Sequence, residues 1–144
     1  MAVTYTNNWK NILTALMSKI RAEMKCPVFS NFYETNKANQ FIRLIPTGST
    51  QVDKATHMEV REFNVDIQYF FLNRKSTDFQ NYVLNQVSIL EALVHDNIVL
   101  TLDDSTTFVN VSMETLELDV DVDEYDDYFV AQWTLTGTHF GNTA

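Results

Sequence analysis

The sequence predicts an α+β fold in which one antiparallel or mixed β-sheet packs against two amphipathic helices. Two stretches carry apolar residues at three- and four-residue spacing, as helices do, and several others alternate as strands do. Of the 144 residues, 45% are hydrophobic, and only three Gly and two Pro occur. A chain of this length buries about two-thirds of its unfolded surface in one core. Residues 1–144 are therefore expected to form a single domain with few linkers.

The first helix is expected over residues 8–24, about four turns long. Asn7 or Asn8 can cap its start, and Pro27 forces its end. One face of this segment is apolar and the other carries charged residues, so the helix should lie on the sheet. The apolar stripe contains Trp9, Ile12, Leu13, Leu16, Met17, Ile20 and Met24.

Two short strands should follow, at 27–33 (PVFSNFY) and 40–46 (QFIRLIP), joined as a hairpin by a polar loop. The next segment, 46–57 (PTGSTQVDKATH), contains Pro46 and Gly48 and has almost nothing to bury. It is expected to project as a flexible arm. Thr47, Gly48, Gln51, Asp53 and Lys54 are its candidate contact residues.

The segment 58–72 (MEVREFNVDIQYFFL) alternates from Phe63 to Phe71, which predicts a long strand. Met58 and Val60 lie on the opposite phase, so a bulge or bend is expected near Arg61 and Glu62. A second helix is expected over 77–95, because Thr77 and Gln80 have the spacing of a capping box. Its apolar residues keep helical spacing, and the remainder of the chain is predicted to be β.

Residues 118–128 (LDVDVDEYDDY) hold six carboxylates. The spacing of Asp119, Asp121 and Asp123 is that of the start of an EF-hand calcium loop, which requires Gly at its sixth position and Glu at its twelfth. Those positions are Glu124 and Val130 here, so the match fails. Weak cation binding at the tip remains an alternative, and no metal site or cofactor is predicted.

The same stretch fits an acidic hairpin better. If residues 124–127 form the loop, Val122, Val120, Leu118 and Leu116 pair with Phe129, Ala131, Trp133 and Leu135. The core would then lie on one face, and acids on the other face and the tip. This surface is the candidate lumen or interface, with Glu117, Asp119, Asp121, Asp123, Glu124, Asp126 and Asp127.

Charge is segregated along the chain. Residues 1–75 carry ten Lys/Arg and six Asp/Glu, net +4, whereas residues 76–144 carry thirteen Asp/Glu and no Lys/Arg, net −13. One interpretation is a subunit whose basic and acidic surfaces meet different partners, including copies of itself in a head-to-tail array. The alternative is that the two halves interleave in the fold and mix their charges.

Several function classes are disfavoured. Common hydrolase, nucleotide-binding, protease and redox motifs are absent from the sequence, so an enzyme is not expected. Sequence-specific DNA binding needs clustered Lys/Arg, which the chain lacks. The start, MAVTYTNNWK, does not have the pattern of a signal peptide, and the longest wholly apolar run is the four residues YFFL. Neither signal-peptide export nor a membrane span is therefore expected. The single Cys26 fits a reducing compartment.

The order of elements resembles the tail-terminator, or tail-completion, proteins of long-tailed bacteriophages. This resemblance covers the first helix at 8–24, the hairpin with its protruding loop 46–57, the strand 58–72, the second helix and the closing acidic hairpin. It implies a virion protein of the tail or neck, assembled in the host cytoplasm. Such a subunit closes into a homo-oligomeric, six-membered ring that caps the tail tube and joins it to a neck or head-completion protein.

The acidic residues suit such a ring, because an acidic lumen would repel DNA phosphates and let genomic DNA pass without sticking. The arm at 46–57 could reach a neighbouring subunit or the tube. A tail-tube or neck-adaptor subunit is the first alternative. A calcium-dependent binding module that uses the acids at 119–127 is the second.

Overall fold

The computed structural model describes residues 6–31, 38–55, 58–73, 77–122 and 125–142. These residues form two helices and a six-stranded sheet with the strand order β1-β2-β3-β6-β5-β4. The helices are α1 (Asn8–Glu23) and α2 (Phe79–Asp96). The strands are β1 (Val28–Phe29), β2 (Gln40–Ala55), β3 (Met58–Leu72), β4 (Val99–Thr101), β5 (Thr107–Leu118) and β6 (Tyr128–Asn142).

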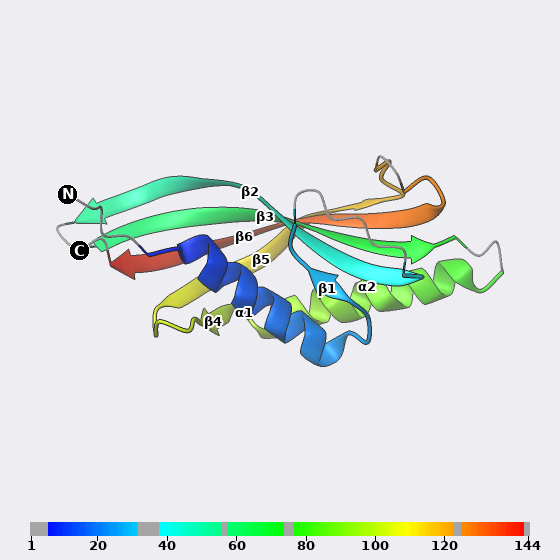
Figure 1. Ribbon diagram of the computed structural model, residues 1–144, viewed down its shortest axis with the longest axis horizontal. Coiled ribbons are helices and arrows are strands. Elements are labelled where there is room, and N and C mark those ends of the chain that lie inside the picture. The colour runs from blue at the N-terminus through cyan, green and yellow to red at the C-terminus, as the bar shows by residue number, and fades with distance from the viewer. Residues whose placement is uncertain (1–5, 32–37, 56–57, 74–76, 123–124, 143–144) are drawn as a thin grey trace.

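The sheet dominates the molecule and curls into a half-barrel (Figure 1). About half of the described residues lie in strands, and β2, β3 and β6 are each 15 or 16 residues long. The predicted class, α+β with one antiparallel or mixed sheet packed against two amphipathic helices, is therefore wrong. The physical reason is that residues assigned to a loop pair as strands, and long twisted strands coil a sheet on itself.

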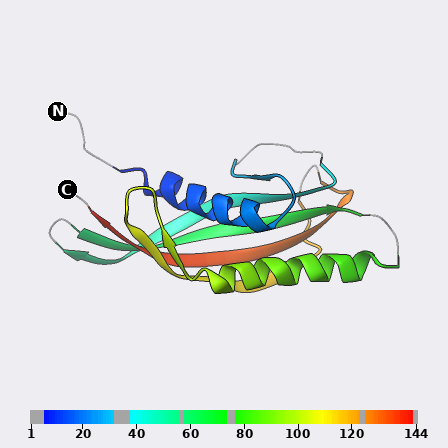
Figure 2. The same cartoon turned by 90° about the horizontal axis from the view of Figure 1, so that it is seen from below.

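Both helices lie on one face of the sheet, as the two views show (Figures 1 and 2). α1 follows the predicted stripe: Ile12, Leu16 and Ile20 are buried, and the Asn7 side chain accepts a hydrogen bond from the Lys10 backbone N–H at 3.1 Å. α2 buries Val83, Val87, Leu90 and Val94, which keep the predicted helical spacing, but the Thr77 capping box does not form. Its N-cap is Asp78, whose side chain makes no capping hydrogen bond. No helix in the described part of the chain combines the length and apolarity that crossing a bilayer requires.

The core between the helices and the sheet contains the odd-numbered residues of β3 from Phe63 to Phe71, together with Trp133 and Leu135 of β6. The alternation predicted for 58–72 is thus confirmed from Phe63 onward. β3 pairs with β6 without interruption, so the bulge predicted near Arg61 is not in this strand. It is in the partner strand β2, between Gln51 and Asp53.

The first two strands do not form a hairpin. β1 is only two residues long and pairs in parallel with β2, with Val28 opposite Ile42. A hydrogen bond from the Ile42 N–H to the Pro27 carbonyl, at 2.9 Å, continues this contact. The predicted strand 27–33 falls partly outside the described residues, and the antiparallel pairing assumed for it is wrong.

The prediction of a flexible arm at 46–57 is also wrong. β2 continues through it and pairs with β3 as far as Ala55 opposite Met58. We call this extension, residues 47–55 of β2 and 58–64 of β3, the wing (Figure 1). The Thr47 hydroxyl donates to the Asn64 carbonyl at 3.1 Å, Gln51 faces Arg61, and Lys54 faces Glu59. A strand whose faces are partly in water tolerates such polar residues.

Candidate functional surface

The helix-free face of the sheet, here called the outer face, is polar over its middle part. The side-chain alternation of the strands places even-numbered residues of β3 and β6 on this face, opposite the core. Rows of cross-strand neighbours run from β2 to β5. The pairing of β3 with β6 is uninterrupted, and the pairings of β2 with β3 and of β5 with β6 each contain two register shifts. Its middle rows contain Arg43, Glu62, Asn64, Asp66, Gln68, Ser112, Thr115, Glu117, Gln132, Thr134, Thr136 and Thr138.

A hydrogen-bonded ladder crosses three strands of this face. Arg43 donates to the Gln68 side-chain oxygen, and the Gln68 amide donates to Gln132 Oε1 at 2.9 Å. The Arg43 guanidinium carbon lies 5.2 Å from the Phe70 ring centroid and 5.6 Å from that of Tyr125. Burial lowers the pKa of Arg43, and these ring faces and amide oxygens replace its lost water. The Arg43 cation therefore links β2 to β3 and is hardly accessible to ligands in solvent.

Beside this ladder, the outer face is acidic. Burial and the nearby charge of Glu117 raise the pKa of Asp66, which is on the adjacent row. Glu62, Glu114 and Glu117 are exposed, and within the described residues none of them forms an ion pair. The ion pair that the described residues do contain lies in the wing, where Arg61 Nε is 2.8 Å from the Glu59 carboxylate. The middle of the face therefore presents negative charge to solvent with little compensation.

The acidic stretch does not form the predicted hairpin. β5 ends at Leu118, which pairs with Ala131, and Leu116 pairs with Trp133. The register is two residues away from the prediction, although Leu116 and Leu118 keep the predicted face. Asp119 adopts a left-handed conformation with φ 58°, and the chain leaves the strand there. The Val120 N–H donates a hydrogen bond to the Val130 carbonyl, at 3.0 Å, where the chain leaves the strand.

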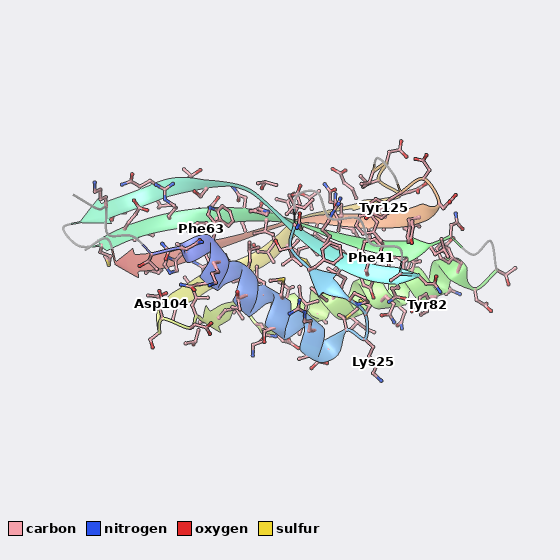
Figure 3. The ribbon with its side chains drawn as sticks, viewed as in Figure 1. Lys25, Phe41, Phe63, Tyr82, Asp104 and Tyr125 are labelled. Carbon is pink, nitrogen blue, oxygen red and sulfur yellow. The ribbon has the colours of Figure 1, made fainter. Side chains whose placement is uncertain are left out.

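After this turn, the chain folds over one end of the outer face. Tyr125 is buried against Phe41, Phe70 and Val130, and Val120 and Val122 pack around them. Figure 3 shows Tyr125 next to the end of the sheet that carries Phe41. Asp119, Asp121, Asp126 and Asp127 are exposed on this covering segment. Asp123 and Glu124, also predicted for this surface, lie outside the described residues.

Of the predicted acids that the structure describes, Glu117 alone lies on a strand of the outer face. Sequence reasoning missed Arg43, Asp66, Gln68 and Gln132. The signal was present, since Arg43 alternates with Ile42 and Leu44, and Asp66 and Gln68 alternate with Ile67 and Tyr69. Their positions on long strands were sufficient to place them on one face.

A buried histidine ties a loop to the sheet. His139 Nε2 lies 2.8 Å from the Thr106 hydroxyl, which itself donates to Asp104 Oδ1. Because the Thr106 proton is given to Asp104, the His139 nitrogen must be the donor to Thr106. This direction is the reverse of that in a hydroxyl nucleophile activated by histidine. Among the described residues, no three His, Cys, Asp or Glu side chains lie close enough to hold a metal ion.

Comparison with known proteins supports the fold. No protein-family model matches the chain, and a search of curated proteins finds no match. A chain of the virion of a native gene transfer agent particle is similar in structure, with a TM-score of 0.57 and 14% identity over 95% of this chain and 100% of that chain. Another solved structure, of a protein identified only by a number, has a TM-score of 0.55 and 13% identity over 92% of each chain. At these identities, the likeness establishes a shared fold.

Proposed function

We propose that this protein is a structural subunit of a phage-like virion. The observation that carries this proposal is the end-to-end match with a chain of the gene transfer agent virion, which covers 95% of this chain and the whole of that one. The likeness is therefore not confined to one part of the fold. The role proposed is structural rather than enzymatic.

The finer proposal is a homo-oligomeric ring, of six copies as in tail terminators, at the junction of head and tail. Two sheet edges support it. Among the described residues, the edge of β2 that faces away from β3 pairs only with the two residues of β1. Residues 112–118 of β5 likewise pair with no strand on the edge that faces away from β6. Open edges invite pairing with another chain, and a head-to-tail contact between unlike edges closes into a ring when its rotation permits.

In this ring the outer face is proposed to line the lumen. Its exposed Glu62, Glu114 and Glu117 would repel DNA phosphates, and its buried Arg43 would not attract them. The genome would pass without sequence-specific binding. The ring's two ends would contact the tail-tube protein and a neck or head-completion protein. The proposed location is the virion tail or neck, after assembly in the host cytoplasm.

Native mass spectrometry and mass photometry of the purified protein test the ring directly. The expected result is conversion of monomer into one discrete closed species as concentration rises, and a stoichiometry of six. Co-purified tail-tube protein should increase the ring fraction by mass action, since a partner that binds only the ring stabilises it. A protein that stays monomeric with and without the tube protein contradicts the ring.

A tail-tube subunit is the second candidate, because the wing extends the sheet beyond α1 and offers a surface for stacking one ring on another (Figure 1). The same measurement separates the two candidates. A tube subunit yields a ladder of masses spaced by one ring and filaments in negative-stain images, whereas a terminator stops at one ring.

A further inference from the structure

The outer face ends in a row of large apolar side chains beside the Arg43 ladder. Phe41, Phe70 and Val130 are cross-strand neighbours on β2, β3 and β6, and all three have 0% of their surface in solvent. We call them the apolar row. Their burial does not come from the helices, because both helices lie on the opposite face of the sheet (Figures 1 and 2). Another part of the chain must therefore exclude water from the row.

The cover is the segment between β5 and β6, of which the structure describes residues 119–122 and 125–127. We call these residues the covering segment. The centroid of the Tyr125 ring lies 4.7 Å from that of Phe70 and 5.6 Å from that of Phe41. The two valines of the covering segment pack against the same cluster. These contacts show that the apolar row accepts an aromatic side chain flanked by β-branched ones.

A left-handed backbone at Asp119 bends the covering segment over the row. Its φ is 58°, a conformation that residues other than Gly adopt at a cost in free energy. Before the bend, β5 pairs Leu118 with Ala131. With an extended Asp119, the same register would place Val120 opposite Phe129, on the core side of the sheet. The segment therefore has two paths, one bent over the apolar row and one straight along β6 that uncovers the row.

We infer that, in the assembled protein, the covering segment of each copy lies on the apolar row of a neighbouring copy. This inference rests on the ring proposed above and names a contact between its subunits. A second copy fits the row because its Tyr125 offers the ring that the row already accepts within one copy. The Arg43 guanidinium, 5.6 Å from the centroid of this ring, favours an aromatic face over an aliphatic side chain. Exchange of an identical element is a low-cost route to association, and a strained hinge such as Asp119 favours it.

The positions of the two surfaces on the sheet suit a repeating contact. The covering segment leaves from β5 and β6, whereas the apolar row extends across β3 to β2, toward the other side of the sheet. The two surfaces that meet are therefore unlike surfaces of one subunit. A contact between unlike surfaces runs head to tail and closes into a ring when its rotation permits.

Photocrosslinking of isotopically mixed protein tests the exchange. Tyr125→p-benzoylphenylalanine keeps an aromatic group at this position and links it, under ultraviolet light, to the side chains that it touches. Unlabelled copies with this substitution are mixed as monomers with isotopically labelled unmodified copies and then concentrated until they assemble. The expected product joins the substituted position of an unlabelled chain to labelled peptides that contain Phe41 or Phe70. In dilute monomer the same linkage should lie within one chain.

The hinge supplies an independent test. Asp119→Gly relieves the left-handed backbone of the bent path, whereas Asp119→Val penalises it, because a β-branched residue rarely adopts this conformation. Both substitutions remove the same charge. Asp119→Val should therefore need at least about tenfold less protein for half-assembly than Asp119→Gly, which corresponds to about 1.4 kcal/mol. Combined with the crosslinker, it should also give the larger fraction of linkages between chains.

Asn110→Gly and Asn110→Val are the matched controls. Asn110 is another left-handed residue of β5, with φ 54°, but it lies at the bulge between Val109 and Ser112, away from the apolar row. These two variants should assemble at the same protein concentration. Circular dichroism and thermal unfolding identify any variant that does not fold. If the crosslinker variant is lost in this way, the hinge pair decides the question, and if the hinge pair is lost, the crosslink decides it.

The outcomes separate this inference from the ring itself. Linkage between chains in dimers or open chains, without a closed species, supports the exchange and contradicts the ring. Closed rings in which the crosslinker reacts only within its own chain support the ring and overturn the exchange. Equal half-assembly concentrations for Asp119→Gly and Asp119→Val also overturn it. A protein that stays monomeric and links only within one chain overturns both.

Discussion

The guanidinium of Arg43 donates two hydrogen bonds to one oxygen, Gln68 Oε1, from Nε at 3.0 Å and from Nη2 at 2.7 Å. Arg43 is only 7% exposed and Gln68 is also 7% exposed. The pair links β2 and β3 on the outer face, which is not covered by the core that the helices form on the other side of the sheet. A buried cation without a carboxylate depends on such oxygens and on aromatic faces, here Phe70 and Tyr125.

Arg43→Met should reduce the free energy of unfolding by about 2 kcal/mol, because Gln68 Oε1 loses both donors in a buried site. Gln68→Met should cost a similar amount, since it leaves the cation unsatisfied. The double variant should cost about 1–2 kcal/mol less than the sum of the two. Urea unfolding of the four proteins measures this coupling. Ser18→Ala, on the exposed side of α1, is the control partner and should be additive with Arg43→Met; additivity of Arg43 with Gln68 as well would contradict the tie.

Gly137→Ala should destabilise the protein by about 1–3 kcal/mol. A Cβ at this position would lie 2.3 Å from Cζ of Phe108, whose ring is fully buried and has no room to withdraw. Gly48→Ala is the matched control, because its Cβ would meet nothing within 4 Å. That substitution should leave stability unchanged or raise it by up to about 1 kcal/mol through loss of chain entropy in the unfolded state. Equal melting temperatures for the two variants would argue against this packing.

Unfolding stability should fall on acidification through the titration of His139. Burial lowers the pKa of His139, and the charge of Asp104 opposes this only in part. Arg61 is opposite His139 on β3 and is neutralised by Glu59. The unfolded chain then binds the proton more readily than the folded one, so stability is lost as pH falls below about 6.5, by at most about 1.4 kcal/mol per pH unit. His139→Gln should flatten this slope in urea titrations between pH 7.5 and 5, whereas His95→Gln, exposed on α2, should retain it. A slope that is identical in all three proteins would exclude His139 as the source.

The sequence was sufficient for the elements whose residues bury one face. Ile12, Leu16 and Ile20 of α1, and the run from Phe63 to Phe71 of β3, carry a periodicity that depends only on local geometry. The prediction missed the wing because most of its side chains are in water and give no periodic apolar signal. Its backbone is instead satisfied by pairing with residues 3 to 16 positions further along the chain. Thr47 and Lys54 were therefore mistaken for loop residues.

The prediction of a hairpin in the acidic stretch, residues 118–128, failed for a different reason. Val120 and Val122 continue the alternation of Leu116 and Leu118, so periodicity alone extends the strand. The left-handed backbone at Asp119 sends them to the opposite face, where they pack around Tyr125. Asp tolerates this conformation better than most residues, but the requirement comes from the tertiary cluster. Glu117 therefore keeps its predicted place on the face opposite the core, whereas the predicted path of the chain after Leu118 is wrong.

The assignment of the outer face to the lumen makes a prediction about DNA. Glu62→Lys/Glu117→Lys should convert an unattractive face into one that holds duplex DNA, because two exposed acids of the same face become cations in every copy of the ring. Glu91→Lys/Asp96→Lys changes the net charge equally but places the lysines on α2, away from that face. With closed rings at about 50 mM salt, fluorescence anisotropy of a short labelled duplex should show at least about tenfold tighter binding to the first variant than to the second.

The salt dependence adds a second readout. Each lysine that neutralises a phosphate steepens the fall of log affinity with log salt by about 0.9, so the outer-face variant should have the steeper slope. The unmodified ring should bind weakly at all salt concentrations. Equal affinity and equal slope for the two variants would mean that DNA responds to net charge alone. That result would contradict the assignment of the outer face to the lumen. Tighter binding by the α2 variant would place the helices, rather than the outer face, toward the path of the genome.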